Sequence, residues 1–366
     1  MSEGIVRILR ADGSLEKGCS VPAVSLEEQV QLYGTMLLNR RIDERMIKLQ
    51  RQGRLGFYIG SIGEEAAVVG SAFVLRKSDW IIPCYRELGA ALWRGFPLYD
   101  LFCQLFSNAE DGVKGRQMPN HYAASDLRFG SISSPVGTQI PQAVGLAWAA
   151  KISGSEDVVL VYFGEGATSE GDFHVGANFG SVFEAPVVLF CRNNQWAISV
   201  PISRQTASES IAIKAQAYGM KGVRVDGNDV LGVISVAREA VDRARAGGGP
   251  TLVEAETYRL SAHSTSDDPR VYRDPSDVEV WKGRDPLRRF KAYLIKQGHW
   301  SEEREKELEE EIRDEIQDNL QKAEAIGPPP VETMFEDVFD KIPWHLREQL
   351  GELQEAEEPR KVEQKA

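Results

Sequence analysis

The chain has 366 residues, of which 42% are apolar and 27% charged, and its formal net charge is −12. This length allows roughly two domains of about 150 residues, or one large α/β domain with extensions. The composition excludes collagen-like, low-complexity and wholly disordered chains. The acidic balance argues against a general nucleic-acid-binding protein, which needs clustered lysine and arginine.

No apolar run approaches the roughly 20 residues that a membrane-spanning helix needs. The first residues do not show the charged-then-apolar layout of a signal peptide, so we expect a cytoplasmic protein that contacts neither membrane nor nucleic acid. The four cysteines have no CxxC spacing and the five histidines form no HExxH pair, which argues against a disulfide framework and a zinc hydrolase.

The first third of the chain is predicted to be an irregular arm followed by helices. Residues 1–30 mix short apolar pieces with glycine and proline. Helical spacing then runs from residue 26 to about residue 52, with apolar side chains on one stripe. Glycines at 53, 56, 60 and 63 interrupt regular structure, and a second helix is expected from about Glu64 to Ala72.

The centre of the chain predicts an open, mostly parallel sheet with helices on both faces. Residues 157–163 and 186–191 are short runs that are almost entirely apolar, as in strands covered on both faces. A helix-length segment, 171–183, separates them. Residues 223–225 and 252–255 resemble further strands, with a helix expected at 230–246 between them. We therefore predict one α/β domain over residues 31–300.

The end of the chain has a different character. Ser301 can cap a helix whose first turn is acidic, and apolar residues recur every fourth position from Leu308 to Leu320. This stripe is expected to pack on the main domain or on a partner. We predict a helical extension over residues 301–350 and a charged, disordered tail over 351–366.

The strongest chemical signal follows the two central strands. Glu165 lies between two glycines directly after the first strand, and Arg192 and Asn194 follow the second. Since neighbouring parallel strands end at one crevice, Glu165 and Asn194 can meet there as hard oxygen ligands for Mg²⁺, beside a diphosphate. A plain strand–helix turn with a solvated carboxylate is the alternative. Ser169 stands where a dinucleotide fingerprint needs glycine, which disfavours a nicotinamide dehydrogenase.

These motifs resemble those of thiamine-diphosphate enzymes, in which Gly-Asp-Gly is followed some thirty residues later by Asn-Asn. Here Glu165 replaces the aspartate, as the branched-chain branch of the family often has it. Further matching segments are 85–87, 114–119, 133–145, 224–229 and 263–268. Together they are similar to the alpha subunit of the decarboxylating component of a 2-oxoacid dehydrogenase complex, with the branched-chain type closest, over roughly residues 30–345.

The resemblance implies a thiamine-diphosphate-binding fold and a role for each matching position. Magnesium ligands would be Glu165, Asn194 and Trp196 through its carbonyl. Positions matching the diphosphate and ring contacts are Tyr85, Arg86, Ser134, Val136, Gly164, Gly166, Ala167, Arg192 and His263, with His263, Ser134 and Tyr85 next to the chemistry. Phe57 and Tyr58 would line the acyl pocket. Ser133, Pro135, Thr138 and Gln139 match a potassium site of mitochondrial relatives. For His121, a role in positioning substrate stands beside a plain packing role.

The family's reaction implies partners. A glutamate that activates the cofactor belongs to the beta subunit in this family, so we expect an alpha2beta2 heterotetramer that is inactive as alpha alone. The chain would decarboxylate a 2-oxoacid and reductively acylate the lipoyl group of an acyltransferase partner. The sequence favours branched-chain 2-oxoacids, that is, 3-methyl-2-oxobutanoate dehydrogenase activity. Pyruvate as substrate and a non-catalytic scaffold of the same fold are the alternatives.

Overall fold

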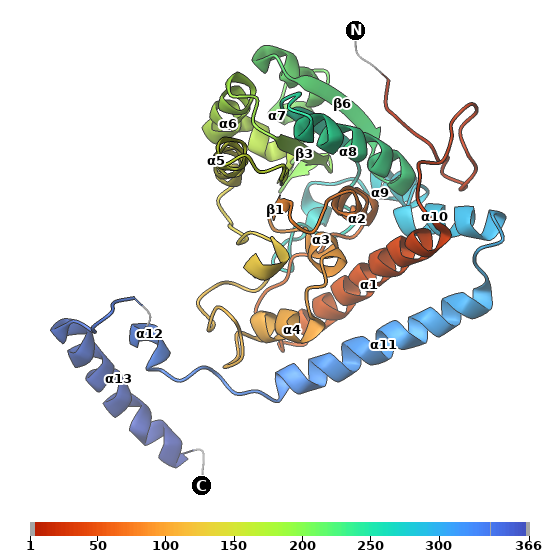
Figure 1. The fold of residues 1–366 in the computed structure, drawn as a ribbon. Coiled ribbons are helices and arrows are strands. Elements are labelled where there is room, and N and C mark those ends of the chain that lie inside the picture. The colour runs from red at the N-terminus through yellow and green to blue at the C-terminus, as the bar shows by residue number, and fades with distance from the viewer. Residues whose placement is uncertain (1–3, 337, 364–366) are drawn as a thin grey trace.

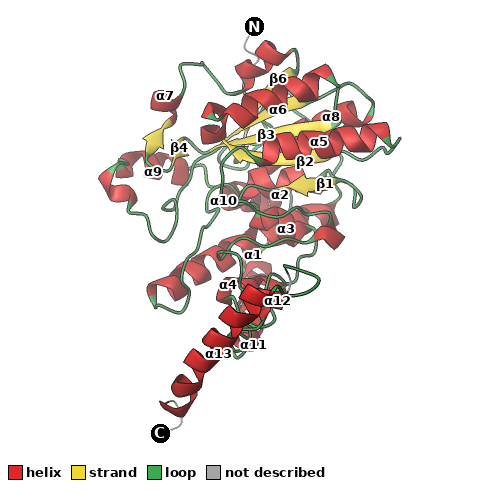
Figure 2. Ribbon diagram, turned by 90° about the vertical axis from the view of Figure 1, so that its left-hand side faces the viewer, coloured by secondary structure: helices red, strands yellow, loops and turns green. Residues whose placement is uncertain are grey.

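The computed structural model describes residues 4–336 and 338–363. Its centre is a five-stranded sheet in the order β1-β2-β3-β7-β6, in which every neighbouring pair is parallel (Figures 1 and 2). The predicted sheet is confirmed. Its strands are β1 (Trp80–Ile82), β2 (Val159–Gly164), β3 (Val187–Asn193), β6 (Lys221–Asp226) and β7 (Thr251–Glu256).

Side chains of β2 and β3 alternate between two hydrophobic cores. Val159, Val161 and Phe163 belong to a core under α5 and α6, whereas Leu160 and Tyr162 belong to a larger core that includes α1, α2 and α8. Both faces of these strands are therefore covered, which explains why their sequences are continuously apolar.

Helices cover both faces of the sheet and extend the molecule at its C-terminal end (Figures 1 and 2). Strands β4 (Trp196–Ala197) and β5 (Val200–Pro201) form a small antiparallel pair beside the sheet. The helices are α1 (Leu26–Arg51), α2 (Glu65–Phe73), α3 (Leu88–Trp93), α4 (Leu98–Phe106), α5 (Gln139–Ile152), α6 (Gly171–Val182), α7 (Ile202–Gln205), α8 (Val230–Arg245), α9 (Pro275–Lys282), α10 (Pro286–Lys296), α11 (Glu302–Glu324), α12 (Thr333–Glu336) and α13 (Trp344–Glu363).

The C-terminal helices differ in how they meet the body. Ser301 caps α11 through a hydrogen bond from the Arg304 amide, and Ile312, Ile316 and Leu320 are buried in the larger core, as the apolar stripe predicted. Helix α13 lies apart from the sheet and its covering helices (Figure 1). It starts within the predicted helical extension and continues through residues 351–363, which were predicted to belong to a disordered tail and are helical here; residues 364–366 of that predicted tail lie outside the described residues. Glutamate, glutamine, leucine and lysine are strong helix formers, so composition alone misjudged this segment.

Within the described residues, no helix combines the length and apolarity that crossing a membrane requires.

Candidate active site

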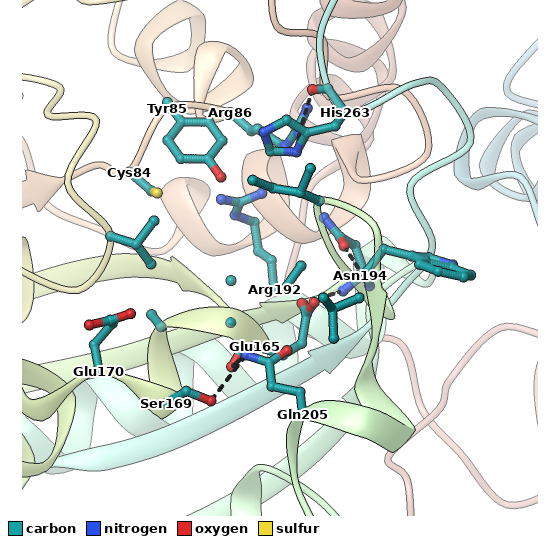
Figure 3. Close-up of a pocket in the computed structure, with 18 of the residues that line it drawn as sticks. Cys84, Tyr85, Arg86, Glu165, Ser169, Glu170, Arg192, Asn194, Gln205 and His263 are labelled. Atoms are coloured by element: carbon teal, nitrogen blue, oxygen red, sulfur yellow. Dashed lines mark hydrogen bonds between the residues drawn. The ribbon is translucent and has the colours of Figure 1, made fainter. Parts of the chain in front are cut away.

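A cavity of about 650 Å³ opens where β2 and β3 end (Figure 3). Gly164 ends β2, and a short 3-10 turn, Glu165–Ser169, separates it from α6. A Cβ atom on Gly166 would lie 3.0 Å from the Cβ of Ala197, so this position leaves little room for a side chain. The two loops thus approach each other closely at one edge of the sheet.

Glu165 and Asn194 meet in this cavity. The backbone amide of Asn194 donates a hydrogen bond of 3.3 Å to Glu165 Oε2. The second carboxylate oxygen, Oε1, is buried and accepts no hydrogen bond from any residue that the structure describes. Burial, together with the nearby carboxylate of Glu64, raises the pKa of Glu165 to about 7. A buried carboxylate oxygen without a donor suits a cation, which would also restore the charged form.

The amide of Asn194 has a fixed orientation. Its Nδ2 donates to Glu64 Oε1 at 2.9 Å, and the Trp196 amide donates to its Oδ1 at 3.2 Å. The described chain contains no cluster of three or more His, Cys, Asp or Glu residues that could hold a metal. A cation here would therefore rely on a mixed set of carboxylate, amide and backbone oxygens, completed by ligand or water oxygens.

Arg192 lines the cavity, but its guanidinium group forms ion pairs with two buried carboxylates. Its Nη1 lies 2.5 Å from Glu64 Oε2, and its Nη2 contacts Glu87. The side chains of Glu64 and Glu87 are fully buried, and that of Arg192 is 2% exposed. Only Nε of the guanidinium lacks a hydrogen-bond partner among the described residues. Arg192 thus joins α2 and the start of α3 to the end of β3.

Two other arginines surround His263. Arg86 Nη2 donates to His263 Nδ1 at 3.0 Å and to the His263 carbonyl at 2.7 Å, and Arg259 Nη1 donates to the same Nδ1 at 3.3 Å. Guanidinium groups only donate, so Nδ1 is an acceptor and Nε2 carries the proton. Burial and the two arginines lower the pKa of His263 to about 3. Neither arginine forms an ion pair with a carboxylate in the described part of the chain.

The loop that carries His263 is tied to the segment after α1. The Thr265 amide donates to the Tyr58 carbonyl at 3.0 Å, and the Tyr58 amide donates to Thr265 Oγ1 at 3.0 Å. The Leu260 amide donates to the Ile62 carbonyl at 3.1 Å. Because Phe57 and Ile59 line the cavity, this ladder fixes that wall relative to His263.

A family model described as "Dehydrogenase E1 component" matches residues 33–332. The chain belongs to the dehydrogenase E1 component family. Membership of the E1 component family implies dependence on thiamine diphosphate.

Relatives within the E1 component family match nearly the whole chain. The 2-oxoisovalerate dehydrogenase subunit alpha 1, mitochondrial, of Arabidopsis thaliana is 43% identical over 350 residues, which cover 95% of this chain and 74% of the relative. The mitochondrial 2-oxoisovalerate dehydrogenase subunit alpha of Mus musculus and that of Homo sapiens are each 42% identical over 350 residues, covering 95% of this chain and 79% of the relative. The resemblance predicted from the motifs is confirmed. An alpha subunit of this kind implies a beta subunit and an acyltransferase as partners.

The expectation of a cytoplasmic location is wrong by this comparison. All three relatives are named as mitochondrial proteins. The expectation used only the first residues of the chain. The lack of a secretory signal-peptide layout does not distinguish a cytoplasmic protein from a mitochondrial one.

Most of the predicted site residues share the one cavity. Those that line it are Phe57, Tyr85, Arg86, Ser134, Val136, Gly164, Glu165, Gly166, Ala167, Arg192, Asn194, Trp196 and His263. Tyr58 does not line it: its side chain is fully buried, and its hydroxyl donates to Asp43 at 2.7 Å. The acyl-pocket prediction therefore fits the placement of Phe57 but not that of Tyr58.

The four residues of the predicted potassium site lie beside the cavity rather than on its wall. Thr138 Oγ1 donates to the Pro135 carbonyl at 3.1 Å. Gln139 Nε2 donates to the Tyr162 carbonyl at 2.9 Å, and its buried Oε1 has no partner in the described chain. Ser133 precedes them on the loop that leads into α5. Potassium binding here stays a prediction.

Sequence reasoning missed several residues that shape the site. Glu64 was taken for the start of a helix, which it is, but its buried contacts with Arg192 and Asn194 were not foreseen. Glu87 lies in the matching segment 85–87, but its contact with Arg192 was not foreseen, and Arg259 stands in no motif that spacing could single out. Exposed Arg204 adds a cation to the cavity wall.

Proposed function

We propose that this chain is the alpha subunit of a branched-chain 2-oxoacid dehydrogenase and acts with thiamine diphosphate and Mg²⁺. One observation carries the proposal: Glu165 and Asn194 meet at adjacent strand ends, in a cavity whose opposite wall holds Arg86 and His263. The substrate class follows the names of the relatives, which act on 2-oxoisovalerate.

The residues present fit the cofactor. Glu165 Oε1, which has no donor among the described residues, the Asn194 side chain and the Trp196 carbonyl would hold Mg²⁺. A diphosphate with Mg²⁺ keeps about one negative charge, which suits the guanidinium group of Arg86. Arg192, the second predicted contact, is already paired with Glu64 and Glu87 and could offer the diphosphate only its Nε. The other predicted contacts to the diphosphate and the ring are Tyr85, Ser134, Val136, Gly164, Gly166, Ala167 and His263. Thiamine diphosphate, once bound, supplies the electron sink for loss of carbon dioxide.

His263 is suited to hold a proton at a defined atom. Its Nδ1 is occupied by Arg86 and Arg259, so Nε2–H is the group available to a ligand. With its pKa lowered to about 3, the ring stays neutral at physiological pH and donates a hydrogen bond without carrying charge. Tyr85 packs edge-on against this ring, with ring centroids 6.1 Å apart, and limits its rotation.

The proposal includes an alpha2beta2 assembly. The cavity unites the predicted diphosphate contacts in one place, and the resemblance assigns the activating glutamate to the beta subunit. We therefore expect no turnover from this chain alone. With a beta chain, it should decarboxylate the 2-oxoacid and pass the acyl group to a lipoyl-bearing acyltransferase.

The test is binding and turnover with and without a beta chain. Calorimetry with thiamine diphosphate and Mg²⁺ should show binding by the reconstituted complex and a large loss in Glu165→Gln. Glu170→Gln is a matched control, because Glu170 also lines the cavity but is exposed. Equal binding by the two variants, or turnover by the alpha chain alone at a comparable rate, would refute the proposal.

A panel of 2-oxoacids tests the substrate. The 2-oxoacids of valine, leucine and isoleucine should have higher kcat/KM values than pyruvate. Because one or two methylene groups in an apolar pocket are worth only ~1–3 kcal/mol, the expected preference is about 10- to 200-fold. Preference for pyruvate would move the assignment to a pyruvate dehydrogenase alpha subunit.

A further inference from the structure

We infer that His121 is a positioning residue that fixes the hydroxyl of Ser134 with its oxygen lone pairs toward the cavity. Ser134 lines the cavity, whereas His121 lies behind it and is 6% exposed. The direction of the hydrogen bond between His121 and Ser134 follows from the contacts of the two side chains. Only the identity of the ligand that meets Ser134 rests on the proposed function.

The contacts of the His121 ring determine where its proton lies. Nδ1 is 3.1 Å from the Pro119 carbonyl oxygen, and Nε2 is 2.5 Å from Ser134 Oγ. A carbonyl oxygen only accepts, so Nδ1 carries the proton of the neutral ring and Nε2 is an acceptor. The Ser134 hydroxyl must then donate to Nε2, which leaves only its lone pairs for a ligand. A ligand group at this place has to donate an N–H or an O–H.

The backbone around His121 is well anchored. The His121 amide donates to the Met118 carbonyl at 3.1 Å, and Gln104 Nε2 donates to the same carbonyl at 2.8 Å. Asn120 has a φ of +69° and exchanges two hydrogen bonds, of 3.0 and 3.3 Å, with the backbone of Ile59. Ile59 lines the cavity, so the segment that carries His121 is held to the cavity wall both through Asn120 and Ile59 and through the contact of His121 with Ser134.

His263 provides an internal contrast. There the arginines occupy Nδ1, so the proton lies on Nε2. At His121 the Pro119 carbonyl demands the proton on Nδ1. The two histidines thus have opposite tautomers. His263 presents an N–H donor to the cavity, whereas His121 makes the Ser134 hydroxyl an acceptor there.

The first experiment measures the tautomers directly. The full-length chain with ¹⁵N-labelled histidine is studied by NMR at pH 8, where an ordinary histidine is neutral. Signals are assigned through His121→Asn and His263→Asn; the chain has five histidines. We expect the Nδ1–H form for His121 and the Nε2–H form for His263. An Nε2–H form at His121 would overturn the inference whatever the cofactor.

The second experiment separates positioning from packing. His121→Asn keeps a donor near the Nδ1 position but loses the contact with Ser134, whereas His121→Gln can place an acceptor near the Nε2 position. In the complex with a beta chain, binding of thiamine diphosphate with Mg²⁺ and kcat/KM are measured for both variants, for Ser134→Ala and for the double variant His121→Asn/Ser134→Ala. His174→Asn is the control, because exposed His174 lies on α6 outside the cavity.

We expect His121→Asn to weaken cofactor binding or kcat/KM about three- to tenfold, the effect of one hydrogen bond. His121→Gln should recover most of this loss, and the double variant should be no worse than Ser134→Ala. Equal losses for Asn and Gln, or fully additive losses in the double variant, would refute the inference. If the wild-type complex binds no thiamine diphosphate, the proposed function fails while the NMR result still decides the tautomers.

Discussion

Replacing Arg192 with methionine should destabilise the protein even when no cofactor is present. The guanidinium lies between Glu64 and Glu87, and all three side chains are at most 2% exposed. Methionine keeps much of the volume but leaves two buried carboxylates without their cation. Removing one partner of a buried ion pair costs about 3–5 kcal/mol. At about 2 °C per kcal/mol for a large domain, the melting midpoint should fall by about 6–10 °C.

Scanning calorimetry of the cofactor-free complex with a beta chain measures this effect. Arg204→Met is the control, because Arg204 lines the same cavity but is exposed, and its midpoint should move by less than about 1 °C. The double variant Glu64→Gln/Arg192→Met should recover part of the loss. Burial raises the pKa of Glu87 even beside Arg192. Losing the cation should raise it further, so the deficit should grow from pH 5 to pH 8. A cofactor-free Arg192→Met protein that melts like wild type would show that Arg192 serves only a ligand.

Three further predictions test the fold. Burial raises the pKa of Asp43 to about 7, so between about pH 4 and 7 the folded protein holds a proton that the unfolded chain has lost, and stability falls as pH rises. Asp43→Asn should flatten this fall in urea unfolding, and an unchanged slope would contradict the reasoning. A Cβ on Gly222 would lie 2.3 Å from the Ala212 carbonyl oxygen, so Gly222→Ala should cost about 1–3 kcal/mol in the same assay, whereas Gly145→Ala, in open space on α5, should cost nothing. Ser301→Ala should lower the unfolding free energy by about 1 kcal/mol and speed hydrogen exchange in the first turn of α11, and unaltered exchange would argue against the cap.

The parts of the fold that the sequence predicted are those with strong local patterns. Strands β2 and β3 are covered on both faces and read as unbroken apolar runs, and α1 and α11 have capping serines and apolar stripes. Strand β1 was not predicted because only Trp80–Ile82 pair with β2, which is too short for a periodic signal. The helix beginning at Trp344 starts inside the predicted helical extension, but its continuation over residues 351–363 was not predicted, because a charged composition describes a solvated helix as well as a disordered segment.

The candidate site was predictable where neighbours in the sheet are also neighbours in sequence. Glu165 and Asn194 each follow one of two adjacent strands, so their meeting followed from topology. The contact of Arg192 with Glu64 joins residues 128 positions apart. It depends on how α2 packs against the end of β3, and no local spacing encodes it. The same holds for Arg259, whose importance becomes visible only once its contact with His263 is known.

The backbone ladder between residues 58–62 and 260–265 has a consequence for how such a protein can diverge. Widening the wall near Phe57 to admit a bulkier acid would shift Tyr58, and through the hydrogen bonds of Tyr58 with Thr265 it would displace the nearby imidazole of His263. A change in the size of the acid-binding wall would thus also move the proton that His263 carries. Relatives that act on a different 2-oxoacid should therefore differ in both segments of this ladder. A chimaera that exchanges only one of the two segments should have low activity.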